Sequence, residues 1–202
     1  MSNERRKYTM RRRAEKEQQT RQRITEAAVK LHGTIGPART TISAVASEAG
    51  VQRATVYRHF PDEATLFAAC SGHWAATHPP PDPTPWRTIR DPAARLKRGL
   101  FELYAFYRET EAMLENVTRD RPLVPAMEKP AAIMRAYFEA VAEALVAGRP
   151  ERGAARRRVR AAVGHAVSFP TWRSLVREHG LGDDEAVAMM AAMVEAAGRA
   201  RR

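Results

Sequence analysis

Apolar residues recur at helical spacing along most of the chain, and no segment alternates apolar and polar residues as a strand would. The first stripe is Ile24, Ala27, Ala28 and Leu31, at positions i, i+3, i+4 and i+7 of one helix face. Later stripes comprise Leu96, Leu100, Leu103, Tyr104 and Tyr107, then Met134, Tyr137, Phe138, Val141 and Leu145, and then Val159, Val163, Ala166 and Val167. The pattern predicts an all-α fold.

Proline and charge divide this helical pattern. Residues 1–17 are polar and basic with almost no apolar residue, which predicts a disordered arm. Helical periodicity then continues as far as the segment 79–85, where five of seven residues are proline and the chain must be extended. We therefore expect a first domain at 18–78, a proline-rich connection at 79–89 and a second helical domain at 90–202.

The segment from Thr41 to Phe60 has the pattern of two short helices joined by a tight turn. Ala46 is small where the two helices would cross, and Gly50 supplies the positive φ that a sharp turn requires. A small core between the helices would be closed by Val45, Ala49, Val51 and Val56. This is the pattern of a helix-turn-helix, whose second helix enters the major groove of DNA.

The start of that second helix carries side chains suited to reading bases. Gln52 can pair with adenine and Arg53 with guanine, and Ala54 can touch a thymine methyl group. Thr55 lies at the same end of the helix, and Thr40 or Thr41 is expected to cap the helix before it.

One turn further on, the sequence leaves the roles of three residues open. Tyr57 and His59 can bond phosphate or pack between helices, and Arg58 can face phosphate or solvent. The predicted DNA-binding set is Thr40, Thr41, Gln52, Arg53, Ala54, Thr55, Tyr57, Arg58 and His59.

The charge balance favours a polyanionic partner. Lys and Arg number 34 against 23 Asp and Glu, a formal net charge of +11. The arm at 1–17 can be a solvated tail or can contact DNA. Cys70 is the single cysteine, and neither an apolar run of membrane-spanning length nor a signal peptide is present. We expect a cytoplasmic protein without a membrane partner.

Catalytic and metal-binding patterns are missing from the sequence. Cys70 and His73 lie three residues apart, but no second cysteine supports a metal site. The sequence has no glycine-rich phosphate loop, nucleophile elbow or His-Glu-x-x-His pattern. We therefore expect no enzyme activity, no cofactor and no metal.

The chain resembles the TetR family of bacterial transcriptional regulators over residues 20–74. The motif residues are Thr41-Ile42, Val45-Ala46, Ala49-Gly50-Val51, Thr55-Val56-Tyr57, His59-Phe60 and Leu66. The resemblance implies a three-helix DNA-binding domain followed by a helical ligand-binding and dimerisation domain. One departure is Glu63, because members often have a lysine there that meets phosphate.

The implied function is that of a homodimeric repressor, bound to an inverted-repeat operator in double-stranded DNA and released by a small ligand. A ligand-independent or non-specific nucleoid-type DNA binder is the alternative. Apolar stripes suggest an apolar or aromatic effector, with pocket candidates Phe101, Tyr104, Tyr107, Met113, Met134, Tyr137, Phe138, His165, Phe169 and Trp172. The dimer-interface candidates are Val163, Val167, Met189, Met190, Met193 and Val194.

Overall fold

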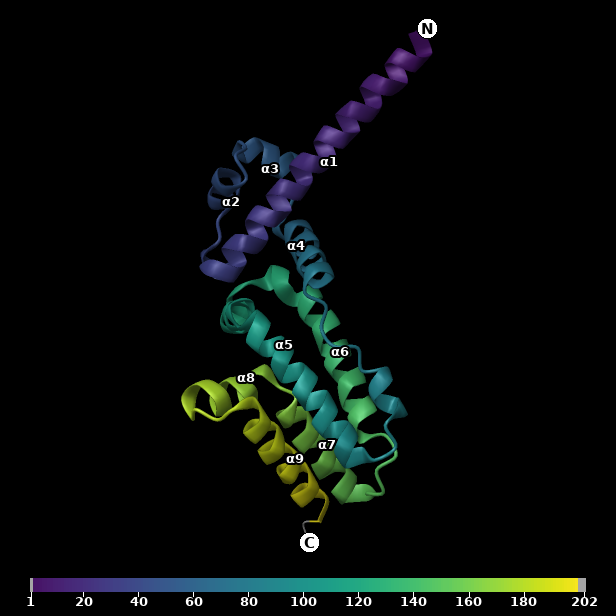
Figure 1. Cartoon of the computed structure of the whole chain (residues 1–202). Coiled ribbons are helices and arrows are strands. Elements are labelled where there is room, and N and C mark those ends of the chain that lie inside the picture. The colour runs from purple at the N-terminus through teal and green to yellow at the C-terminus, as the bar shows by residue number, and fades with distance from the viewer. Residues whose placement is uncertain (1, 200–202) are drawn as a thin grey trace. The chain divides into compact units, whose positions relative to one another are not determined.

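The structure, a computed structural model, describes residues 2–199, with side chains from residue 6 onward, and all regular secondary structure in that range is helical (Figure 1). The α-helices are α1 (Ser2–Thr34), α2 (Ile42–Glu48), α3 (Arg53–His59), α4 (Glu63–Thr77), α5 (Pro92–Asp120), α6 (Glu128–Val146), α7 (Gly153–Ala166), α8 (Phe169–Arg173) and α9 (Asp183–Arg199). Shorter 3₁₀ elements are η1 (Pro37–Arg39), η2 (Pro85–Thr88), η3 (Arg121–Leu123) and η4 (Pro125–Met127), and η5 (Ser174–Glu178) is a π-helix. The predicted all-α fold is confirmed.

The chain forms two compact units, and one boundary between them lies within helix α5. The first unit comprises residues 1–79 and 112–130, and the second comprises residues 80–111 and 131–202. The change of unit near residue 79 coincides with the proline-rich segment. The end of α5, at residues 112–120, lies in the first unit. From the sequence, these residues were expected in the second domain, at 90–202.

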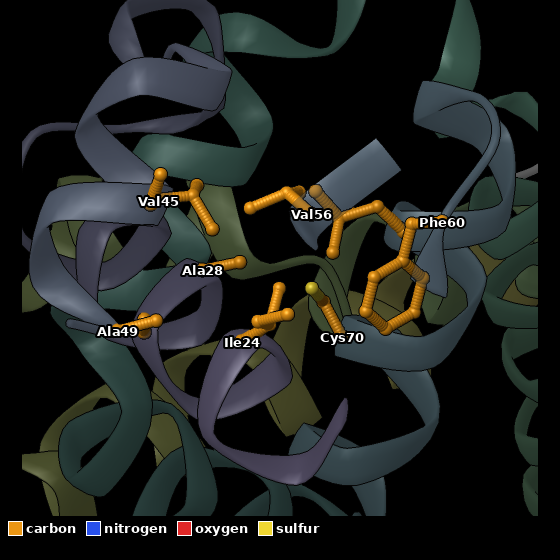
Figure 2. Packing of buried hydrophobic residues seen from close by; sticks show 10 residues of the cluster. Ile24, Ala28, Val45, Ala49, Val56, Phe60 and Cys70 are labelled. Carbon is orange, nitrogen blue, oxygen red and sulfur yellow. The ribbon is translucent and has the colours of Figure 1, made fainter. Parts of the chain in front are cut away.

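The core of the first unit joins α1, α2, α3 and α4. Ile24 and Ala28 on α1 point toward Val45 on α2, Val56 on α3 and Cys70 on α4, and all five are buried (Figure 2). The i, i+3, i+4 stripe of α1 therefore closes a small domain around the two short helices. Burial raises the pKa of the Cys70 thiol to about 12, so this cysteine stays protonated and unreactive.

The first half of α1 differs from the disordered arm expected at 1–17. One helix runs from Ser2 to Thr34, and its N-terminal half projects beyond α3 (Figure 1). Residues 6–19 are exposed, so tertiary packing does not hold them in a helix. The physical reason is local, because Ser2 to Lys30 contains no Gly or Pro and is rich in Arg, Lys, Glu and Gln, which favour helices. An ion pair of Arg11 with Glu15 at i, i+4 adds to this.

The end of α5 is fastened to the first unit by two polar side chains. The Asn116 amide donates to the main-chain oxygens of His32 and Gly33, at 3.0 and 2.9 Å. The Asp120 carboxylate accepts from the main-chain nitrogen of Ala38 at 3.0 Å. Both side chains are buried, so these bonds hold the end of α1 and the start of η1 against α5.

The second unit has an aromatic centre. Tyr107 on α5 lies 5.6 Å from Phe169 and 6.0 Å from Trp172 between ring centroids, and Tyr104 lies beside it. The hydroxyl of Tyr104 donates to the main-chain oxygen of Ala166, and that of Tyr107 to the main-chain oxygen of Val167. These bonds tie α5 to the end of α7, where Ser168 caps α8.

Trp86 fixes the chain after the proline run. Its indole is buried, and Nε1 donates to the Glu102 carboxylate on α5 at 2.9 Å. The ring lies against Gly99, where a β-carbon would approach it to 3.2 Å. The Tyr137 hydroxyl on α6 donates to the main-chain oxygen of Pro81, so the proline segment is held at two points.

Candidate DNA-binding interface

The turn between α2 and α3 is built from a cap and a glycine. The Thr41 hydroxyl accepts from the main-chain nitrogen of Ala44 at 3.1 Å and so caps α2. Gly50 has φ of 64°, and the main-chain nitrogen of Val51 donates to the oxygen of Ala46. The predictions of a cap and of a positive φ are confirmed, and the cap is Thr41, whereas the Thr40 hydroxyl donates to the main-chain oxygen of Gly36.

The second helix, α3, presents a continuous exposed face. Gln52, Arg53 and Ala54 are exposed at its N-terminal end, and Thr55 is half-buried. Tyr57 is 47% exposed and Arg58 is also exposed, one turn further along. Val56 is fully buried between these residues. Side chains with donors, acceptors and a methyl group therefore leave the same helix, as direct reading of base edges requires.

His59 departs from this exposed set. Its side chain is 8% exposed, so it packs inside the first unit and does not face a partner. Burial and the Arg58 guanidinium lower the pKa of His59, which keeps the imidazole neutral at physiological pH. The packing alternative that the sequence left open is the one that the structure favours.

Arg21 holds the end of α3, a role that the sequence did not reveal. Its guanidinium donates to the main-chain oxygen of His59 at 2.5 Å and lies 4.1 Å from the centroid of the Phe60 ring. The main-chain oxygens at a helix C-terminus carry partial negative charge, so this cation stabilises α3 there. The partner lies 38 residues away, so no local pattern could have found it.

The start of α4 carries carboxylates at the place where the family resemblance predicts a lysine. Asp62 caps α4 by accepting from the main-chain nitrogen of Thr65 at 2.6 Å, and this hydrogen bonding lowers the pKa of Asp62. Glu63 is exposed in the first turn. Two carboxylates at this helix start disfavour a phosphate there, because like charges repel.

The predicted pocket residues do not gather around one site. Tyr104, Tyr107, Phe169 and Trp172 are buried and pack on one another. The other candidates are Phe101, which is half-exposed; His165, which is exposed; Met134, Tyr137 and Phe138, which are partly buried on α6; and Met113, which lies in the first unit. Met113 is therefore separated from the set because the end of α5 belongs to that first unit.

Four of the six predicted dimer-interface residues lie in the core of a single chain. Val163, Val167, Met190 and Val194 are buried where α7 packs on α9. The interpretation as a dimer face is wrong for these four, because each helix also needs an apolar face for its own unit. Met193 is partly buried, and Met189 is 52% exposed.

A hollow of about 550 Å³ on α9 is lined by Ala192, Glu195, Ala196 and Arg199.

Two kinds of feature are missing from the described part of the chain. Across residues 2–199, no helix has both the length and the apolar character that crossing a bilayer requires. The same residues contain no cluster of three His, Cys, Asp or Glu side chains arranged to hold a metal ion.

Part of the first unit is similar in sequence to a family of known proteins. Residues 24–70 match the sequence model described as bacterial regulatory proteins, tetR family. Over 69 residues the chain is 41% identical to the HTH-type transcriptional regulator TtgR of Pseudomonas putida. That match covers 34% of this chain and 33% of TtgR, so the chain spans about a third of the length of the curated relatives it matches.

Solved structures resemble the chain over most of its length. NalD, the secondary repressor of the MexAB-OprM multidrug efflux pump in Pseudomonas aeruginosa, is 20% identical and has a TM-score of 0.58, over 91% of this chain and 96% of NalD. A TetR transcription regulator from Haloarcula marismortui is 15% identical and has a TM-score of 0.54, over 90% and 97% of the two chains. At these identities the likeness shows the fold, an N-terminal helix-turn-helix followed by further helices.

Proposed function

We propose that the chain is a TetR-family regulator of transcription that binds DNA sequence-specifically, because residues 24–70 match that family's model and 69 residues are 41% identical to TtgR. The observation that carries the proposal is the exposed face of α3. Gln52 and Arg53 leave its N-terminal end beside Ala54, and Tyr57 and Arg58 follow one turn later. A regulator acts where the chromosome is, so we expect to find the protein in the cytoplasm.

Selection of bound duplexes from a random DNA pool tests this proposal. The expected product is an inverted repeat whose half-sites lie about one helical turn or slightly more apart. The Arg53→Ala variant should lose about 1–3 kcal/mol of discrimination at one base pair of each half-site. A pool without an enriched motif, bound as tightly as the starting pool, would instead indicate the non-specific nucleoid-type alternative.

We propose that the protein acts as a homodimer through an exposed face of α7 and α9. TetR-family regulators usually bind their operators as dimers, because one short recognition helix contacts few bases. The exposed residues on this face are mostly small, which lets helices approach closely: Ala161, Gly164, Ala188, Met189, Ala192 and Ala196. Burying Met189 and the hollow beside Ala192 would complete a four-helix contact with a second copy.

Light scattering on two matched variants tests this interface. Ala192→Arg places a long cation in the middle of the proposed contact and should yield a monomer. Ala132→Arg places the same side chain on an exposed position of α6 and should leave the dimer intact. A dimer in both variants would show that the chain associates elsewhere.

We propose that the second unit binds a small apolar or aromatic effector that releases the DNA, so that the protein acts as a repressor. The aromatic rings of Tyr107, Phe169 and Trp172 support this, because such rings offer apolar surface with fixed orientation. The rings fill the centre of the unit, so an effector must part them. Thermal-shift screening should then favour aromatic compounds and show a change in Trp172 fluorescence, while stabilisation only by charged compounds would contradict the proposed chemistry.

A further inference from the structure

Two buried arginines meet at the end of the second unit where α6 is connected to α7. Arg95, in the first turn of α5, is 4% exposed, and Arg149, in the connection, is 5% exposed. The Arg95 guanidinium donates to the main-chain oxygens of Ile89 and Ala147, so it joins the segment before α5 to the residue after α6. Figure 1 shows the start of α5 and this connection at the same end of the unit.

The described residues do not satisfy either guanidinium group fully. Nε of Arg95 and Nε of Arg149 are buried, and neither donates a hydrogen bond to another described group. Arg149 pairs with Glu195 through another nitrogen, and its Nε lies 3.7 Å from the Glu151 carboxylate, beyond hydrogen-bonding distance. Arg95 bonds to main-chain oxygens and makes no ion pair with a described residue. A buried donor without an acceptor and a buried charge without a counter-ion both cost stability, so an anion bound here would stabilise the fold.

The surroundings of this pair carry an excess of positive charge. Residues 87–95 and 143–160 together contain nine arginines and three carboxylate side chains. Asp91 already accepts from two main-chain nitrogens at the start of α5, at 3.1 and 3.2 Å, and Glu143 pairs with an exposed arginine of α7. The carboxylates therefore compensate only part of the charge, and the remainder favours an anionic ligand.

Arg87 adds an exposed cation to the two buried ones. It lies on η2, and its side chain makes no hydrogen bond or ion pair with a described residue. Burial lowers the pKa of Arg95, and the guanidinium groups of Arg149 and Arg87 act in the same direction, while Asp91 opposes them. Both arginines are therefore close enough for their fields to act on Arg95. Arg87 is the one of the three that an anion in solvent reaches directly.

We propose that Arg87, Arg95 and Arg149 form a binding site for a phosphate group, which we call the arginine site. Guanidinium groups match phosphate oxygens in geometry and charge. A tetrahedral dianion directs its oxygens in several directions, so it can accept from three separate guanidinium groups, including the two buried Nε atoms. The ligand is inorganic phosphate or a small molecule that carries a phosphate ester. This site is separate from the aromatic centre of the unit, and the inference does not rest on the proposed regulatory function.

Thermal unfolding in the presence of inorganic phosphate tests the arginine site, with the ionic strength held constant by sodium chloride. A ligand that binds only the folded chain raises Tm with its concentration, and the curve gives its Kd. Wild type should show such a rise. Arg87→Gln changes an exposed side chain and should weaken phosphate binding about tenfold, as expected for one lost hydrogen bond to a charged group. Arg157→Gln removes the same charge from an exposed position of α7 and should leave the Kd unchanged.

Arg95→Gln tests the buried part of the arginine site. The change removes two hydrogen bonds to the main chain and lowers Tm without phosphate, so the informative quantity is the further response to phosphate, which should be lost. Methyl phosphate titrated in parallel identifies the source of the group, because a site for free phosphate alone rejects the ester. A phosphate response that is equal in wild type, Arg87→Gln and Arg95→Gln, or no larger than that to chloride, would overturn the inference. Arg95 would then serve only to offset the partial negative charge at the end of α6.

Discussion

Tyr57 and Val56 are neighbours on α3 with opposite environments, and together they define what this helix does. Val56 is fully buried and Tyr57 is 47% exposed. Tyr57→Phe removes only a hydroxyl, so the free energy of unfolding should stay within about 0.5 kcal/mol of wild type. Operator affinity should fall about tenfold, as expected when a hydrogen bond to a charged phosphate is lost.

Val56→Ala provides the opposite control for Tyr57→Phe. It should lower the free energy of unfolding by about 2 kcal/mol, because two buried methyl groups are removed and a cavity is left. Operator titration and urea unfolding measure the two effects separately. Unchanged operator affinity in Tyr57→Phe would show that the hydroxyl does not bond phosphate.

His32 gives the first unit a dependence on pH. Its imidazole is buried and stacks on Phe67 at 4.8 Å, and burial lowers the pKa of His32 to about 4, although Asp120 opposes the shift. Between pH 6.5 and 4 the unfolded chain therefore binds a proton that the folded chain does not bind. Stability should fall as the pH is lowered through this window, by roughly 3 kcal/mol in total.

Urea unfolding of wild type and His32→Gln at about pH 7 and pH 5 measures this contribution. The variant cannot titrate at this position, so its loss of stability on acidification should be smaller than that of wild type. The lowered pKa of His59 acts in the same direction in both proteins and cancels in the comparison. Equal losses would mean that the pKa of His32 is the same in the folded and the unfolded chain.

Single-residue predictions succeeded where the cause was local. The cap at Thr41 and the positive φ of Gly50 follow from hydroxyl and glycine chemistry within a few residues. The roles of Arg21 and Asn116 could not be predicted, because their partners lie 38 and 84 residues away. His59 was ambiguous for the same reason, since burial of its side chain depends on how the first unit packs and not on the neighbouring residues in the sequence.

At the scale of an element, α5 is closely packed at Gly99. A β-carbon there would approach the Leu145 side chain to 2.7 Å and the Trp86 ring to 3.2 Å. Gly99→Ala should therefore destabilise the protein by about 1–3 kcal/mol despite the higher helix propensity of alanine. The Trp86 fluorescence should also change, because its ring must move.

Gly72→Ala on α4 is the matched control for Gly99→Ala. The position is helical, exposed and free of other atoms within 4 Å, so alanine should raise stability by about 0.5–1 kcal/mol. Chemical unfolding of both variants gives the comparison. A stabilising effect at Gly99 would show that α5 and Trp86 do not meet as closely as described.

Helical periodicity identified most helices but misjudged the first. The stripes of α5, α6 and α7 follow the 3.6-residue period, and the structure has helices there. The start of α1 has no apolar stripe, so the sequence suggested disorder, whereas uninterrupted helix propensity accounts for the observed helix. Buried arginines were also missed: Arg95 donates to the main-chain oxygens of Ile89 and Ala147, an arrangement with no signature in sequence.

At the scale of the whole molecule, the sequence could not sort apolar residues between core, pocket and dimer contact. Val163 and Met190 are core, and Met189 is exposed, yet all three are apolar residues on helices of similar composition. Periodicity reports that a face is buried without identifying its partner. Only the arrangement of α7 against α9 separates the face used within the chain from the face that we propose for a second copy.

The course of α5 suggests how effector and DNA affect each other. Residues 92–111 of this helix belong to the second unit, and residues 112–120 belong to the first, where Asn116 holds the end of α1. A continuous helix transmits displacement along its axis, so an effector that shifts α5 should disturb that hold. We expect an effector found by thermal-shift screening to weaken operator binding by about 5–150-fold, a coupling of about 1–3 kcal/mol, and the operator to weaken effector binding equally.

Asn116→Ala tests that route against Thr118→Ala, an exposed change on the same helix. Asn116→Ala removes two hydrogen bonds to α1 and should cost about 1–3 kcal/mol of stability. Because α1 is no longer held by α5, the factor by which the effector weakens operator binding should shrink toward one, while Thr118→Ala keeps it. Calorimetric titration of effector with and without operator measures the factor in each protein. An unchanged factor in Asn116→Ala would mean that effector binding affects the DNA-binding unit through another element. Substitutions in α4 would then be the next to test.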